Sequence, residues 1–152
     1  MNTLREIRHS MKVALPLIAF VIISLAGGCQ SVYDIKFSTS TRGYTKEIVI
    51  TPKIITLHEL NAREPDKEKN LTWEIKKEDW KKVLQSLDGV MLRELPLLKA
   101  PSNKRNSDAA RASTFTITDK KAKIWYHYFD DEEPNEELMP LMKVITELVA
   151  GK

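Results

Sequence analysis

The sequence predicts an α+β fold: a mainly antiparallel sheet of about six strands in the order ββββαββα, with two amphipathic helices on one face. Strand-like stretches are grouped along the chain rather than alternating with helices, which favours an antiparallel sheet. Two further stretches have apolar residues at helical spacing. A length of 152 residues, with 42% hydrophobic and 30% charged residues, is typical of one globular domain and excludes a disordered chain.

The first 28 residues have the composition of a signal peptide. Arg5, Arg8 and Lys12 precede an uncharged apolar run at 13–25, which is shorter than the ~20 residues needed to span a bilayer. Small residues follow, and then Cys29, the single cysteine of the chain. The alternatives for this segment are a transmembrane anchor, or a secretory signal that a cysteine follows by chance.

The run Leu25-Ala26-Gly27-Gly28-Cys29 resembles the lipobox of bacterial lipoproteins. The resemblance implies that residues 1–28 are removed and that Cys29 receives a diacylglycerol and an N-acyl chain; we expect no other cofactor. Several acyl chains anchor a protein stably, because each buried CH₂ contributes roughly 0.8 kcal/mol. Gln30 follows the cysteine instead of the Asp that resembles an inner-membrane retention signal, which points to the outer membrane.

We expect the mature chain to consist of a lipidated tether, residues 29–32, and a single α+β domain, residues 33–152. Its first part predicts four strands, from alternating apolar residues or from β-branched composition. These strands are residues 33–39, 44–51, 54–60 and 71–75.

The chain then changes to a helical period. Trp80, Val83, Leu84 and Leu87 fall at i, i+3, i+4 and i+7, which predicts an amphipathic helix over residues 77–87. A second helix is predicted after Pro134, with apolar residues at helical spacing as far as Val149. Pro140 removes a backbone hydrogen bond inside that pattern, so it requires a kink or a later start.

Between these helices lie a long connection and a hairpin. Residues 92–112 are irregular; we expect their apolar first half to pack across the sheet. Residues 114–119 and 123–129 predict two strands joined by a turn. The second strand is apolar on both faces, which predicts a central position in the sheet. The three tryptophans all fall on predicted core faces: Trp73, Trp80 and Trp125.

A further resemblance extends over most of the mature chain. The run Leu97 to Ser102, then Arg105 and Asp108, followed by Phe129-Asp130 and Pro134, resembles small envelope lipoproteins of Bacteroidetes-type bacteria. In that pattern a His and a Gly follow the Asp that corresponds to Asp130, whereas in this sequence acidic residues follow it. The resemblance implies no particular activity.

The residues for enzymatic catalysis are sparse. After Cys29 the chain has two histidines, His58 and His127, both in strand patterns typical of half-exposed sheet residues, and no Gly-x-Ser-x-Gly elbow. An acylated cysteine cannot act as a nucleophile. Two isolated histidines are also too few for a zinc site. The formal charge of +3 is too small to predict nucleic-acid binding.

Two groups of charged residues are candidates for binding. The acidic run Asp130, Asp131, Glu132 and Glu133 offers oxygen ligands for calcium but lacks the spacing of an EF-hand loop. The alternative is that these acids simply precede a helix N-terminus, where negative charge is favoured.

The second group is basic. Lys104, Arg105 and Arg111 lie in a polar loop, residues 99–111, which predicts contact with an anionic partner. Arg42, in the turn after the first strand, is a further candidate contact. The alternative for both segments is an ordinary solvated connection.

These observations favour an envelope lipoprotein that is held at the membrane by its lipid and acts as a non-enzymatic binding or structural module. The expected partner is an envelope protein or a glycan. A first alternative is an inhibitor or immunity-type protein that blocks an envelope enzyme through the loop 99–111. A second alternative is a lipoprotein that binds calcium or an anion.

Overall fold

The computed structural model describes residues 32–107 and 110–152. It contains a six-stranded antiparallel sheet together with helices, so the predicted α+β class is confirmed. The strand order across the sheet is β4-β3-β2-β1-β5-β6. The strands are β1 (Val32–Thr41), β2 (Tyr44–Ile50), β3 (Ile54–Asn61), β4 (Lys69–Glu74), β5 (Ala112–Asp119) and β6 (Ile124–Asp130).

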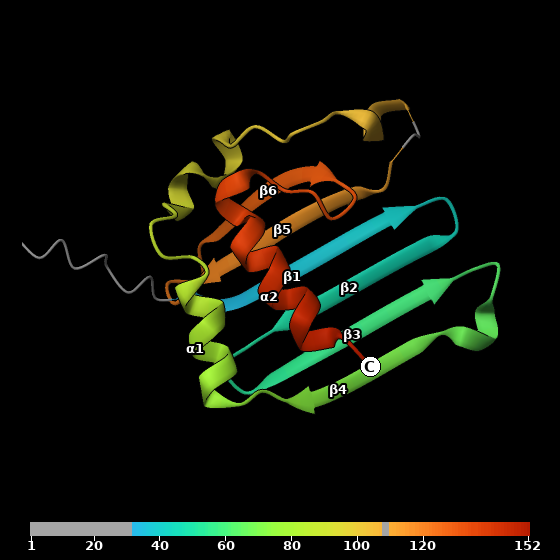
Figure 1. Ribbon diagram of the computed structural model, residues 1–152, viewed down its shortest axis with the longest axis horizontal. Helices are drawn as coiled ribbons and strands as arrows, with labels where there is room; N and C mark the ends of the chain where they lie inside the picture. Colours follow the sequence, from blue (N-terminus) through green and yellow to red (C-terminus); the bar gives the residue numbers. More distant parts are fainter. Residues whose placement is uncertain (1–31, 108–109) are drawn as a thin grey trace, which may run out of the picture.

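Two α-helices and several short 3₁₀ helices connect or cover the strands. The α-helices are α1 (Lys77–Gln85) and α2 (Met139–Val149). The 3₁₀ helices are η1 (Pro65–Lys67), η2 (Leu92–Leu97), η3 (Lys104–Ser107) and η4 (Glu136–Leu138). Figure 1 shows α1 and α2 on the same face of the sheet, which we call the inner face. The opposite, outer face carries neither helix.

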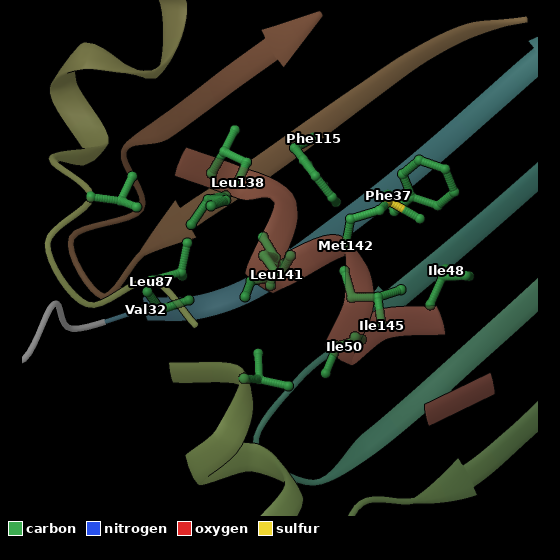
Figure 2. Packing of buried hydrophobic residues seen from close by; sticks show 14 of the residues in the cluster. Val32, Phe37, Ile48, Ile50, Leu87, Phe115, Leu138, Leu141, Met142 and Ile145 are labelled. Carbon is green, nitrogen blue, oxygen red and sulfur yellow. The ribbon is translucent and has the colours of Figure 1, made fainter. Parts of the chain in front are cut away.

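The core lies between the inner face and the two helices. Three phenylalanines from β1, β5 and β6 form its centre: Phe37, Phe115 and Phe129 are fully buried, with ring centroids 5.1–6.2 Å apart. Figure 2 shows Leu141 and Ile145 of α2 directed into this layer. All three tryptophans pack against the core, as the sequence predicts.

The second helix begins later than Pro134. Asn135 caps η4 by accepting a hydrogen bond from the Glu137 amide at 3.1 Å, and α2 then starts at Met139. Pro140 therefore occupies the first turn of α2, where its missing N–H has no helical partner to lose. The later start accommodates this proline without a kink.

The prediction that the last strand is central is wrong, because β6 forms one edge of the sheet. Its side chains divide between two environments. His127 and Phe129 are buried on the inner face, whereas Ile124, Tyr126 and Tyr128 are exposed on the outer face. The connection after α1 also packs here: its 3₁₀ helix η2 lies against β6 rather than across the sheet.

The antiparallel order divides the chain between two ends of the sheet. β1, β3 and β6 begin at one end, which we call the β1-start end (Figure 1). β2, β4 and β5 begin at the other, which we call the far end. Segments that are distant in sequence thus meet at each end.

Candidate functional site

The charged residues that the sequence singles out gather at the far end. Arg42 lies in the turn after β1, Arg111 directly precedes β5, and Asp130 ends β6. The sequence assigns the basic residues to one site and the acidic residues to another. The structure instead brings the two groups into contact with each other.

Asp130 is a buried carboxylate with several hydrogen-bond donors. It is only 2% exposed. Its oxygens accept hydrogen bonds from the Ser102 hydroxyl, from the Lys104 amide at 2.7 Å, from the Arg105 amide at 3.3 Å and from Arg105 Nη1 at 2.6 Å. Burial alone would raise the pKa of Asp130, but these donors outweigh it and lower the pKa to about 2.

Arg111 and Asp131 form a second pair, nearer to solvent. Arg111 Nε lies 3.3 Å from Asp131 Oδ1, and the Arg111 amide donates to the same oxygen at 3.1 Å. The guanidinium also lies 5.5 Å from the centroid of the Tyr44 ring. Tyr44 in turn donates to Glu59 at 2.9 Å. Burial, with help from the bond to Glu59, raises the pKa of Tyr44 to about 12.

The last two residues of the acidic run, Glu132 and Glu133, have different surroundings. Glu132 lies 3.8 Å from Nζ of Lys46 on β2. Glu133 is exposed, and its amide donates to the Asp130 carbonyl at 3.0 Å. Three of the four candidate metal ligands thus have a basic side chain of the protein as their neighbour. Within residues 32–107 and 110–152, no group of three or more His, Cys, Asp or Glu is placed to hold a metal ion.

The first part of the loop 99–111, residues 99–105, is held against the body of the domain. Asn135 Nδ2 donates to the Lys99 carbonyl at 2.9 Å, and Asp130 binds the segment from Ser102 to Arg105. Arg105 is therefore an internal residue of the loop rather than an exposed contact, with 21% of its side chain exposed. Lys104 and Arg42 are the exposed basic candidates.

The two histidines have different environments. His58 is half-exposed on the outer face, with Nδ1 2.9 Å from Asn70 Oδ1. His127 is buried, contrary to the half-exposed position that the sequence predicts; its Nε2 accepts the Asn135 amide at 3.2 Å. Burial lowers the pKa of His127, although a hydrogen bond with the Leu95 backbone acts in the opposite direction. The contacts of His127 with Asn135 and with the Leu95 backbone thus join β6 to the segments that pack beside it.

An open groove of about 660 Å³ lies along α2. Its mostly apolar lining includes Met139, Pro140 and Met142. Glu132 and Lys143 belong to its charged lining. The groove thus adjoins the charged far end.

The structure also presents a surface that the sequence reasoning missed. Tyr126 and Tyr128 are 44% and 56% exposed on the outer face, with ring centroids 5.1 Å apart. Opposite them on β5 stand Thr116 and Thr114. Alternation along 124–129 placed these tyrosines on one face, but the predicted central position of the strand assigned that face to the interior.

No protein-family model, curated protein or solved structure matches the chain. The predicted signal peptide and Cys29 lie outside the described residues. In the part of the chain that the structure describes, every helix is too short or too polar to cross a membrane.

Proposed function

We propose that this protein is a lipid-anchored, non-enzymatic binding module of the bacterial envelope, and that its outer face binds an envelope glycan. The observation that carries the proposal is the exposed tyrosine pair on a sheet face that neither α-helix covers. The lipobox that ends at Cys29 supports the anchor. Asp130 and His127, whose pKa values are both lowered, already have partners inside the protein.

The chemistry of the outer face suits a polysaccharide. Tyrosine rings offer apolar faces to the C–H groups of a sugar, and their hydroxyls remain available for hydrogen bonds. Beside them, Thr114 and Thr116 of β5 stand level with Ser38 and Lys36 of β1, so hydroxyl groups continue across the face. Lys36 is neutralised by Glu47 at 2.6 Å, which favours a neutral glycan over a polyanion.

The test uses the purified lipoprotein in detergent and protease-treated envelope polysaccharide from the source bacterium, immobilised on beads. The wild-type protein should be retained, and the Tyr126→Ala/Tyr128→Ala double variant should elute in the void. Tyr33→Ala removes an exposed tyrosine outside the pair and should be retained like the wild type. Equal retention of the double variant would refute the glycan site.

A second candidate, an inhibitor that blocks an envelope enzyme through the loop 99–111, is favoured by the contacts that hold residues 99–105 of this loop. A loop that Asp130 already holds loses little conformational entropy when it binds a target. A photo-crosslinking residue at exposed Asn106 should then capture one envelope protein in cells. The glycan proposal predicts no dominant protein at this position above a Cys29→Ser control.

A further inference from the structure

The β1-start end differs from the far end in the charge of its turns. The two turns that join paired strands at this end, residues 51–53 and 120–123, contain lysines and no acidic residue: Lys53, Lys120, Lys121 and Lys123 are all exposed. The corresponding turns at the far end, residues 42–43 and 62–68, together contain three basic residues (Arg42, Arg63 and Lys67) and three acidic residues (Glu64, Asp66 and Glu68).

Acidic groups also occur close to these lysines, but one of them is already engaged. Asp119 accepts the amides of Lys121 and Lys123 at 2.8 and 3.0 Å, so its carboxylate is part of the turn. Asp34 and Glu74 lie in the adjoining strand ends, and Glu78 and Asp79 lie in the first turn of α1, which follows β4 at this end. The ammonium of Lys123 lies 3.9 Å from the centroid of the Trp125 ring. Within the two turns themselves, every charged side chain is basic.

The same end exposes apolar side chains. Each of the three strands that begin there has one within its first two residues: Tyr33 of β1 and Ile124 of β6 are each 59% exposed, and Ile54 of β3 is 39% exposed. Tyrosine and aliphatic side chains next to lysines are typical of surfaces that lie at a membrane interface.

The position at which β1 begins supplies a third argument. β1 begins at Val32, three residues after Cys29. Three residues span roughly 11 Å when fully extended. A lipid on Cys29 would therefore keep the β1-start end within about one Debye length of the bilayer surface, where charged groups still interact.

We propose that the β1-start end is a membrane-contact surface that binds anionic phospholipid headgroups and orients the domain on the bilayer. This inference rests on the proposed lipid anchor. The lysines of the two turns face the headgroups, and Tyr33, Ile54 and Ile124 contact the interface. The strands then stand upright on the membrane, so the charged far end points away from the bilayer and the outer face remains open to the envelope.

The test measures the distance of each end from the membrane. The acylated protein is reconstituted into vesicles of phosphatidylcholine with or without phosphatidylglycerol, and a fluorophore is attached to an introduced thiol. Ala122→Cys places the probe in a turn at the β1-start end, and Ala62→Cys is the matched exposed alanine at the far end. Acylation of Cys29 leaves the introduced thiol as the single reactive one.

Spin-labelled headgroups should quench the probe at 122 several-fold more than the probe at 62 in vesicles with phosphatidylglycerol. Replacing the four turn lysines by Gln should reduce this difference toward its value in phosphatidylcholine alone. Equal quenching at both positions, or a difference insensitive to the four substitutions, would overturn the proposal. Palmitate labelling of the same variants separates the outcomes: loss of label refutes the anchor, whereas retained label with equal quenching refutes only the contact surface.

Discussion

Arg105 Nη1 lies 2.6 Å from Oδ1 of the buried carboxylate of Asp130, and this pair joins the segment 102–105 to the end of β6. The sequence places these two residues in separate candidate sites. Their contact gives both a structural role, because Asp130 also accepts the amides of Lys104 and Arg105. The segment 102–105 is thereby attached to the surface of the domain.

Replacing Asp130 by Asn should destabilise the domain by about 3 kcal/mol. The change leaves the partly buried Arg105 without its counter-charge, and removing one partner of a buried pair has costs of this size. Urea denaturation measures the effect. Asp131→Asn is the matched control: its pair with Arg111 is 36–40% exposed, so it should change stability by less than ~1 kcal/mol.

The contribution of the Arg105–Asp130 pair to folding stability should depend on pH. The folded pKa of Asp130 is about 2, below its ordinary 3.8, so the unfolded chain takes up the proton first as the pH falls. The stabilisation is complete above about pH 4 and is lost as the pH falls toward 2. The stability difference between wild type and Asp130→Asn should narrow over this window; a constant difference would contradict the assignment.

His127 predicts a second, separate pH effect. Burial lowers its pKa below the ordinary 6.5, so the neutral imidazole is the form that the fold accommodates. Its contribution is present above pH 6.5 and is lost as the pH falls below that value. Thermal unfolding between pH 7.5 and 5 should show this loss in wild type and in the His58→Gln control, but not in His127→Gln.

Tyr44 should ionise at unusually high pH. Burial and the bond to Glu59 raise its pKa to about 12. Glu59→Gln removes the negative charge, so it should lower the pKa of Tyr44. Carbon NMR of the tyrosine ring during alkaline titration follows the residue directly. An unchanged titration in the variant would assign the shift to burial alone.

Much of the fold follows from local sequence patterns. The alternation in β1 and the spacing of Trp80, Val83 and Leu87 each identify an element, because one face must meet the core. The position of β6 does not follow in this way. A strand with apolar residues on both faces is typical of a central strand, whereas here Tyr126 and Tyr128 are exposed at an edge.

The sequence singles out the charged residues of the candidate site, but it does not predict which of them contact each other. Arg105 and Asp130 are 25 positions apart, and no local pattern indicates that they pair. Arg111 and Asp131 are likewise joined only because the start of β5 meets the end of β6. Antiparallel pairing creates these contacts, so charges that look solvated in sequence become partners in the fold.

The most direct test of the lipid-anchored account is metabolic labelling with palmitate in cells that express the wild-type chain or Cys29→Ser. The account predicts a labelled wild-type protein in the membrane fraction. The serine variant should carry no label, because it lacks the sulfur that would hold the diacylglycerol. A Cys29→Ser protein that still carries the label would contradict the account.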